Sequence, residues 1–334
     1  MGLYNRKYEL LGEASMGLLV KGLWQDKWYE SQHGEYVRED SIFRHWITVD
    51  GRPASEDKSG YKAESGRYHL FVSLACPWAH RTLIFRKLKQ LEAHIGVTIV
   101  DPKMLENGWE FSDVSLNNPL GDLRYFHEVY TAAKSDYTGR VTVPVLWDKK
   151  TKTIVSNESS EIIRMFNSEF NHITGNTDDY YPLALHQEIE QVNSLVYENI
   201  NNGVYRAGFA TTQTAYDAAY RRLFEALDQI EQRLSAHRYL VGDKITEADW
   251  RLFTTLIRFD SVYFGHFKTN RQQIEDYPNL SNYLRELYQY EGVSETVDFQ
   301  HIKTHYYFSH TTINPTQVVP NGPDIDYTRS HNRS

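Results

Sequence analysis

The first clear pattern of hydrophobic and polar residues lies between positions 67 and 170, where short apolar runs alternate with helical spacing. Residues 67–73 and 97–100 are predicted strands, and apolar residues recur at helical intervals after Pro77, which suits the first turn of a helix. Two further strands are predicted at 143–148 and 153–155, and the helix that follows is capped by a Ser or Asn. The predicted order is strand, helix, strand, then strand, strand, helix.

The second half of the chain has a helical pattern. Apolar residues recur every three or four positions over residues 216–234, which places them on one stripe of a helix. Residues 246–249 (Thr-Glu-Ala-Asp) have the form of a capping box that opens a further helix. We therefore expect a thioredoxin-like α/β domain over residues 67–170, followed by an all-α domain over residues 180–300.

Segments without regular periodicity flank these two domains. Residues 1–66 hold scattered aromatic residues among Gly, Ser and charged residues, and we expect this N-terminal extension to wrap on the body of the protein. Residues 301–334 are expected to end in an irregular, proline-containing C-terminal extension. The loop over residues 102–139 is long for a compact domain, and loops of that length are often functional.

The composition narrows the class of protein. The 334 residues carry a formal net charge of −8, which favours solubility and argues against a nucleic acid or an anionic membrane as the main partner. No apolar run is long enough to span a membrane, and the first residues lack the pattern of a signal peptide. The single cysteine cannot form an internal disulfide, which fits a reducing compartment, so we expect a cytoplasmic protein.

That cysteine, Cys76, lies where a predicted strand ends and a predicted helix begins. Unpaired N–H groups and the helix dipole favour a thiolate there, and His80 and Arg81 follow one turn later. We therefore expect a thiolate at neutral pH, with a pKa below the usual value of about 8.5. A buried structural cysteine is an equally common reading of this position alone.

Two further motifs favour a binding site near Cys76. A proline at the start of a strand, as in Val143-Pro144, cannot donate to the sheet, and a cis bond there exposes backbone groups to a ligand. Residues 157–160 (Asn-Glu-Ser-Ser) open a helix, where N–H groups and a hydroxyl suit a carboxylate and Glu158 suits an amino group. Taken singly, an edge-strand proline and an ordinary helix cap are the more common explanations of these motifs.

Together the three motifs resemble the glutathione transferase family in their order and separation. Within that family, residues 76–81 (Cys-Pro-Trp-Ala-His-Arg) look like the cysteine-type xi class, the glutathionyl-hydroquinone reductases. Further segments are similar to that class: Gly108-Trp109, residues 140–144, residues 201–210, residues 258–260 with Tyr263, and residues 305–307. The resemblance reaches most of the chain.

The resemblance implies a function and a set of site residues. Cys76 would attack the sulfur of a glutathionyl-hydroquinone, and Tyr205 would protonate the ring carbon, with Tyr263 and Tyr306 lowering the pKa of Tyr205 by hydrogen bonding. A second glutathione would resolve the mixed disulfide on Cys76. Glutathione would be the co-substrate, held by Trp109, Arg140, Val141, Thr142, Val143, Pro144, Glu158 and Ser159. The family also implies a homodimer.

Two other functions stay open from the sequence. An omega-like thioltransferase or dehydroascorbate reductase would use the same cysteine without needing three converging tyrosines. A non-enzymatic module that binds a ligand or a partner on the transferase fold would need neither a reactive cysteine nor the three tyrosines. No metal is expected, because the histidines lack the spacing of metal ligands and only one cysteine is present.

Overall fold

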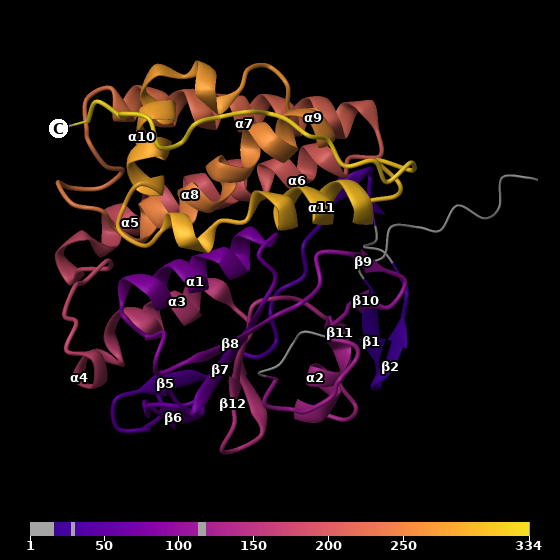
Figure 1. Cartoon of the computed structure of the whole chain (residues 1–334), viewed down its shortest axis with the longest axis vertical. Helices are drawn as coiled ribbons and strands as arrows, with labels where there is room; N and C mark the ends of the chain where they lie inside the picture. Colours follow the sequence, from indigo (N-terminus) through magenta and orange to yellow (C-terminus); the bar gives the residue numbers. More distant parts are fainter. Residues whose placement is uncertain (1–16, 28–30, 113–117, 334) are drawn as a thin grey trace, which may run out of the picture.

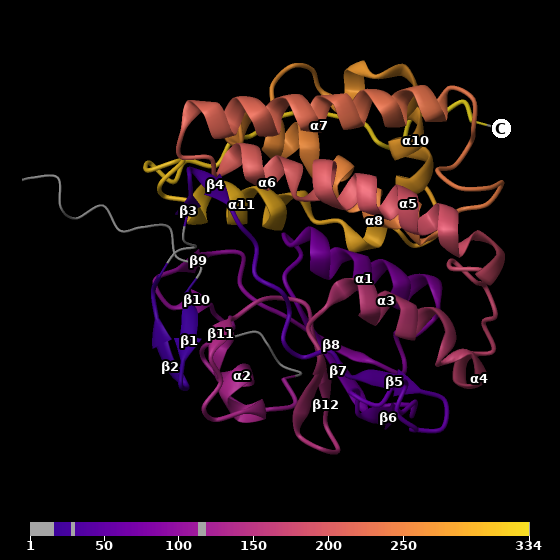
Figure 2. The ribbon, with the colours of Figure 1, turned by 180° about the vertical axis from the view of Figure 1, so that it is seen from behind.

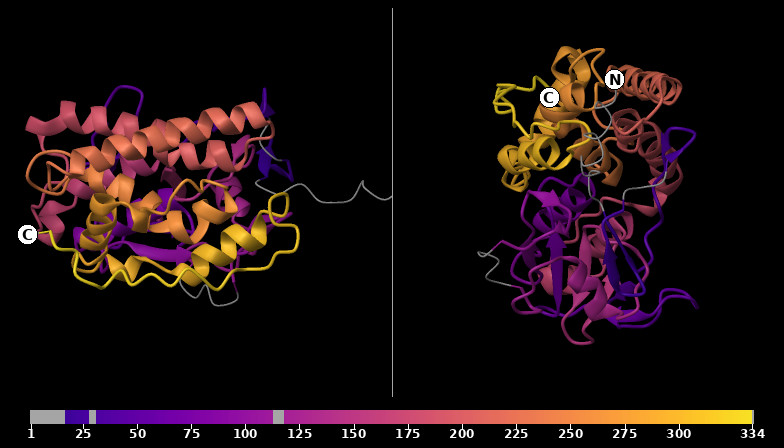
Figure 3. Two further views of the ribbon diagram at one scale, coloured as in Figure 1. Left: turned by 90° about the horizontal axis from the view of Figure 1, so that it is seen from above. Right: turned by 90° about the vertical axis from the view of Figure 1, so that its right-hand side faces the viewer.

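The computed structural model describes residues 17–27, 31–112 and 118–333. It has an α/β part and a helical part that lie side by side along the long axis of the molecule (Figures 1 and 3). Met1 to Lys7, in which the signal-peptide pattern is missing, lie outside the described residues, as do Trp28 and Tyr29 of the aromatic extension.

A four-stranded mixed sheet forms the centre of the α/β part. Its strands are β7 (Tyr68–Val72), β8 (Gly96–Ile99), β12 (Val145–Asp148) and β13 (Thr153–Ser156), in the order β13-β12-β7-β8. β7 runs parallel to β8, with Phe71 opposite Thr98, and antiparallel to β12, with Phe71 opposite Val145. All five residues of β7 are buried. This is the predicted thioredoxin-like arrangement.

Three helices cover this sheet. α1 (Pro77–Leu88) and α3 (Ser159–Ser168), both predicted from the sequence, pack together between the sheet and the helical part. α2 (His127–Ala133) packs against β13 and lies in the segment 102–139, which the sequence predicts to be a loop, so that prediction is wrong there. The side chain of Glu158, and not a Ser or Asn, caps α3 by accepting a hydrogen bond from the backbone N–H of Ser160 at 3.0 Å. The predicted start of this helix is therefore right and the predicted capping residue is wrong.

The helical part is built around α8 (Glu247–Arg258), all of whose residues are buried. It packs against α1, which joins the two parts (Figure 2). The predicted capping box is present, since Asp249 accepts a hydrogen bond from the backbone N–H of Thr246 at 2.8 Å. The other elements are α4 (Asn171–Thr174), α5 (His186–Val196), α6 (Gly203–Gly208), α7 (Gln213–Leu234), α9 (Phe264–His266), α10 (Pro278–Tyr288) and α11 (Phe299–Ser309), with π-helical turns η2 (Tyr197–Asn201) and η3 (Phe259–Tyr263) and 3-10 turns η1 (Leu183–Leu185), η4 (Ile274–Asp276) and η5 (Ser294–Thr296).

The N-terminal extension is more regular than its sequence suggests. It forms β1 (Leu18–Val20), β2 (Leu23–Gln25), β3 (Ser31–Gln32), β4 (Glu35–Tyr36), β5 (Trp46–Thr48) and β6 (Gly60–Lys62), while the long loop holds β9 (Met104–Leu105), β10 (Gly108–Trp109) and β11 (Gly139–Arg140). Strands of two or three residues are too short to show a periodicity. β1 also pairs with β11, more than a hundred residues away.

The extension runs across both parts of the molecule, as the sequence predicts in outline. β3 and β4 lie beside α6 of the helical part (Figure 2). After Ser309, the described residues 310–333 contain no helix or strand, as expected for the tail, whereas residues 301–309 of the expected extension belong to α11. Within the described part of the chain, every helix is too short or too polar to cross a membrane.

Candidate active site

Cys76 occupies the N-cap position of α1, as predicted. A short turn, Ser73 to Ala75, joins it to the end of β7, and the N–H of Cys76 donates to the carbonyl oxygen of Ser73 at 3.2 Å. The thiol donates to the carbonyl oxygen of Val143 at 3.5 Å, and the Val143–Pro144 peptide bond is cis. The first two predicted motifs therefore meet in space, with the sulfur beside the backbone of the proline turn.

The pKa of Cys76 differs from the sequence expectation. Burial raises the pKa of the thiol above its ordinary value, although the N–H groups of Ala79 and Trp78 and the charges of Arg38 and Arg258 act in the opposite direction. The bond to Val143 is one that only the thiol can donate, so it also favours the protonated form. Burial and this hydrogen bond thus favour the thiol form of Cys76 near neutral pH, and the expected lowering of its pKa is wrong.

The charges that act most strongly on Cys76 are those of Arg38 and Arg258, and not those of His80 and Arg81, to which the sequence assigned that role. Burial lowers the pKa of both side chains. His80 lies 2.7 Å from the hydroxyl of Thr296, while Arg81 donates to the side-chain oxygen of Asn201 at 2.7 Å. Both therefore bind α1 to the helical part, and the cations that act on the thiol come from other segments.

The backbone beside Cys76 is held by Tyr130, a residue that no sequence pattern singled out. The hydroxyl of Tyr130 donates to the carbonyl oxygen of Thr142 at 2.6 Å and accepts the N–H of Thr142 at 3.2 Å. It also accepts the side-chain N–H of Asn157 at 3.2 Å. One phenol therefore ties the proline turn to the Glu158 helix start, the second and third predicted motifs. Val141 and Val143 are buried on either side of Thr142.

Two of the predicted glutathione residues are largely covered by neighbouring parts of the chain. Trp109 is only 6% exposed, and its ring stacks on His305 of α11 with the centroids 4.5 Å apart. Arg140 donates to the carboxylate of Glu39 at 3.1 Å and to the carbonyl oxygen of Lys27, both in the extension. Stacking of Trp109 on glutathione and a direct contact with Arg140 remain predictions.

Glu158 carries a negative charge in a well-defined setting. Burial alone raises the pKa of a carboxylate, but hydrogen bonds from the N–H and hydroxyl of Ser160, and the charges of Arg38 and Arg81, hold the pKa of Glu158 below its ordinary value. The hydroxyl of Ser41, in the extension, lies 3.2 Å from the other carboxylate oxygen. The adjacent Ser159 is buried at the first turn of α3. This anion is suited to an ammonium group.

The three predicted tyrosines meet in one cluster. The hydroxyl oxygens of Tyr205 and Tyr306 are 2.6 Å apart, and those of Tyr263 and Tyr306 are 3.1 Å apart. They come from α6, η3 and α11, and Tyr263 and Tyr306 are buried while Tyr205 is half-buried. A Cβ on Gly208 would lie 2.2 Å from the ring of Phe267, so a glycine there allows this ring to pack against Tyr205.

The pKa of Tyr205 also differs from the expectation. Burial, and then the neighbouring phenols of Tyr263 and Tyr306 and the thiol of Cys76, raise the pKa of Tyr205 well above its ordinary value. The predicted lowering by Tyr263 and Tyr306 is therefore wrong. A phenol in this setting keeps its proton at neutral pH, which is the form that a proton donor needs.

Two residues of the extension also belong to this region. The ring of Tyr36 lies 6.4 Å from that of Tyr205 and 5.6 Å from that of Phe209. The guanidinium of Arg38 lies over the ring of Trp78, 4.2 Å from its centroid, and its charge acts on Cys76. The only sequence signal for a role of the extension near the site was its density of aromatic residues.

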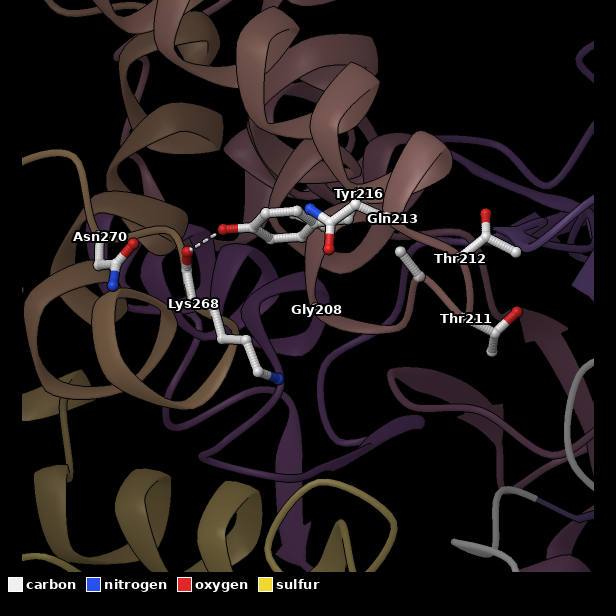
Figure 4. A pocket seen from close by; sticks show the side chains of 9 residues that line it. Gly208, Thr211, Thr212, Gln213, Tyr216, Lys268 and Asn270 are labelled. Atoms are coloured by element: carbon white, nitrogen blue, oxygen red, sulfur yellow. Dashed lines mark hydrogen bonds between the residues drawn. The ribbon is translucent and has the colours of Figure 1, made fainter.

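A surface cavity of about 440 Å³ lies where α6 ends and α7 begins. Figure 4 shows the ring of Tyr216 within it, with the hydroxyl donating to the carbonyl oxygen of Lys268 at 2.7 Å. None of the predicted site residues lines this cavity. The described residues also contain no group of three or more His, Cys, Asp or Glu that could hold a metal ion.

Comparisons with known proteins agree with this geometry. Residues 75–169 match the family model for the glutathione S-transferase N-terminal domain, and residues 213–286 match that for the C-terminal domain. The chain is 53% identical to the glutathionyl-hydroquinone reductase YqjG of Escherichia coli, covering 95% of this chain and 98% of that one. It is 49% identical to the glutathionyl-hydroquinone reductase PcpF of Sphingobium chlorophenolicum, with 92% and 96% covered.

Solved structures give the same result. The glutathione-bound structure of YqjG superposes with a TM-score of 0.88 at 51% identity, covering 95% of this chain and 99% of that one. A xi-class glutathione transferase from Natrialba magadii superposes with a TM-score of 0.87 at 46% identity, with 96% and 97% covered. The extensions are therefore part of the shared fold, because these matches reach well beyond the two domain models.

Proposed function

Because the chain belongs to the glutathione S-transferase family, we propose that it is a glutathionyl-hydroquinone reductase like YqjG and PcpF. It takes a hydroquinone that carries glutathione as a thioether, and returns the free hydroquinone with glutathione as the reductant. The observation that carries this proposal is the contact among the hydroxyls of Tyr205, Tyr306 and Tyr263, in a cluster that is near enough to Cys76 for its thiol to raise the pKa of Tyr205. An omega-like thioltransferase needs no such cluster, because attack on a disulfide expels a thiolate.

In the first half-reaction the thiolate of Cys76 attacks the sulfur of the thioether. The S–S bond of a Cys76–glutathione mixed disulfide forms as the bond between sulfur and the ring carbon breaks. The ring carbon keeps the electron pair and takes a proton from Tyr205, so the sulfur is oxidised and the ring is reduced. The thiol proton of Cys76 is released beforehand, and the phenolate of Tyr205 recovers a proton from solvent.

The raised pKa of Cys76 is compatible with this role. Thiolate nucleophilicity increases with pKa, so the small thiolate fraction of a buried thiol is intrinsically more reactive than that of an acidic one. In the second half-reaction a glutathione thiolate attacks the mixed disulfide and leaves as glutathione disulfide. An outside thiol is required because Cys76 is the only cysteine. The two steps form a ping-pong scheme.

Glutathione lies across the predicted motifs in this proposal. Its cysteinyl backbone pairs with the cis Val143–Pro144 turn, next to the sulfur of Cys76. Its γ-glutamyl end reaches the start of α3, where Glu158 binds the ammonium group and the N–H groups and Ser159 bind the carboxylate. Trp109, Arg140, Val141 and Thr142 line the path between these ends.

A mass measurement tests the proposal. When the protein is incubated with a glutathionyl-hydroquinone and no free glutathione, its intact mass should increase by one glutathionyl group, and an equal amount of hydroquinone should appear. The mass should return to its first value when glutathione is added. Cys76→Ser should show neither change. An unmodified protein that still releases hydroquinone would contradict the covalent scheme.

We also propose that the protein is a homodimer in the cytoplasm, working without a metal. The dimer is supported by the family to which the chain belongs, and the compartment by the single reduced cysteine that the chemistry requires. The natural hydroquinone is set by the aromatic surroundings of Tyr205, which include Tyr36 and Phe209.

A further inference from the structure

Arg258 is the last residue of α8 and is fully buried where this helix packs against α1. Its Nε donates to the carbonyl oxygen of Ala75 at 2.7 Å, and its Nη2 donates to that of Leu74 at 2.8 Å. Both carbonyls belong to the turn that leads directly into Cys76. One side chain from the helical part therefore fixes the backbone that carries the sulfur.

The same guanidinium determines the state of His80. Nη1 of Arg258 lies 3.0 Å from Nδ1 of His80, and since an arginine can only donate, Nδ1 is the acceptor. The ring proton is then on Nε2, which donates to the hydroxyl of Thr296 at 2.7 Å. Burial, and then the charge of Arg258, lower the pKa of His80, so the imidazole is neutral. The positive charge next to the turn belongs to Arg258.

No carboxylate among the described residues forms an ion pair with Arg258. The acceptors of its hydrogen bonds are three backbone carbonyls, those of Leu74, Ala75 and Thr254, and the ring of His80. A buried cation with no anionic partner is unfavourable, and any anion that forms nearby is stabilised by it. The nearby groups that can become anionic are the thiol of Cys76 and the phenols of the tyrosine cluster.

We propose that Arg258 is a positioning residue for the reaction of Cys76. The two guanidinium hydrogen bonds hold the Leu74–Ala75 turn so that the sulfur of Cys76 faces the carbonyl of Val143. The positive charge of Arg258 balances the anion that forms when the thiol loses its proton. This inference rests on the proposed role of Cys76 as the nucleophile. Arg258 thus supplies the charge near Cys76 that the sequence suggested for His80 and Arg81, although it lies 182 positions after Cys76 along the chain.

The other titratable groups around Cys76 and Arg258 do not interfere with a measurement of Cys76 alkylation against pH. Those that face Cys76 or Arg258 are Arg38, His80, His301, His305, Tyr205, Tyr263 and Tyr306. Burial lowers the pKa of the three histidines and raises the pKa of the three tyrosines. Over the alkaline range the histidines are therefore neutral and the tyrosines protonated, so an alkylation profile reports the thiol.

The experiment compares Arg258→Gln with Arg258→Lys, using the rate of Cys76 alkylation by iodoacetamide against pH. Loss of the charge should raise the midpoint by about one unit and slow alkylation near neutral pH about tenfold. The lysine keeps the charge but cannot hold two carbonyls, so its midpoint should stay within about half a unit of the wild type. Its kcat for a glutathionyl-hydroquinone should still fall about tenfold or more.

Arg251→Gln is the matched control, because Arg251 is also buried on α8, about two turns before Arg258, and pairs with Glu247. It should lower the thermal unfolding temperature but leave the alkylation midpoint unchanged. A folded Arg258→Gln protein with the wild-type midpoint would overturn the proposal. If that variant does not fold, wild-type turnover in Arg258→Lys overturns it instead. The alkylation outcome needs no turnover, and the turnover outcome requires an active wild-type reductase, so both are distinct from a failure of the reductase assignment.

Discussion

The hydroxyl oxygens of Tyr205 and Tyr306 lie 2.6 Å apart, although 101 residues separate them along the chain. Tyr306 also reaches Tyr263, so three phenols from three elements share one hydrogen-bonded cluster. Burial raises the pKa of each of them, which keeps the cluster protonated at neutral pH. Tyr205 is half-buried and the other two are buried, so Tyr205 is the phenol that a substrate can reach.

Tyr205→Phe should separate two activities of the protein. Reduction of a glutathionyl-hydroquinone needs a proton on carbon as the C–S bond breaks, and loss of a general acid typically costs about a hundredfold or more in rate. Attack on a small mixed disulfide expels a thiolate that needs no such proton, so this second activity should be largely kept. Steady-state rates with both substrates provide the measurement.

The control for that variant is Tyr216→Phe, which removes a phenol hydroxyl from the surface cavity beside α7 and should leave both rates unchanged. A parallel fall of both activities in Tyr205→Phe would mean that Tyr205 supports packing or glutathione binding. If neither activity changed, the proton would come from another group, with Tyr306 the next candidate.

The thiol of Cys76 should titrate above the ordinary value of about 8.5 in the free protein, because burial raises its pKa. A raised pKa means that the thiolate fraction, and with it the rate of alkylation by iodoacetamide, keeps increasing as the pH rises past that value. Cys76→Ser should take up no label, since the chain has no other cysteine. A midpoint below about 8.5 would show that the backbone N–H groups and cations outweigh burial.

Glu158→Gln should weaken glutathione binding and change the pH dependence of stability. Loss of a charge-assisted hydrogen bond to an ammonium group typically costs about 1.5–3 kcal/mol, which corresponds to a KM for glutathione at least about tenfold higher. kcat should change little, because Glu158 lies away from the reacting sulfur in the proposed complex. Ser168→Ala, at the far end of the same helix, serves as the control, since its hydroxyl bonds only to neighbouring residues.

The sign of the stability effect follows from the lowered pKa of Glu158. Its charged form is favoured by folding, so its contribution is present above the unfolded-state value of about 4.3 and is lost as the pH falls through the folded pKa. The difference in unfolding free energy between wild type and Glu158→Gln should therefore be larger at neutral pH than in acid. Denaturant unfolding at the two pH values measures it, and an equal difference at both would contradict the assignment.

The protein should be a dimer in solution. Light scattering at micromolar concentration should return about twice the chain mass of 39.1 kDa. A value equal to one chain would remove the dimer and leave the chemistry at Cys76 untouched, because every residue of the proposed site comes from a single chain.

Much of the fold could be predicted from local sequence patterns. The four strands of the central sheet and the helices α1 and α3 show the periodicity of buried elements, and the Thr246–Asp249 capping box marks the start of α8 through bonds within one turn. The short strands of the extension could not be predicted, because their partners are remote, as for Leu18 opposite Arg140.

The sequence by itself determined which residues have the right chemistry, since the cysteine at a helix start, the Val-Pro turn and the Glu-Ser pair are local features of the chain. Tertiary structure decided their electrostatics. Burial reversed the expected pKa shifts of Cys76 and Tyr205, and burial, followed by the charge of Arg258 packed against the ring, lowered the pKa of His80 so that it is neutral. These outcomes depend on how deeply each group is removed from water and on which distant charge lies beside it, and neither is encoded in spacing along the chain.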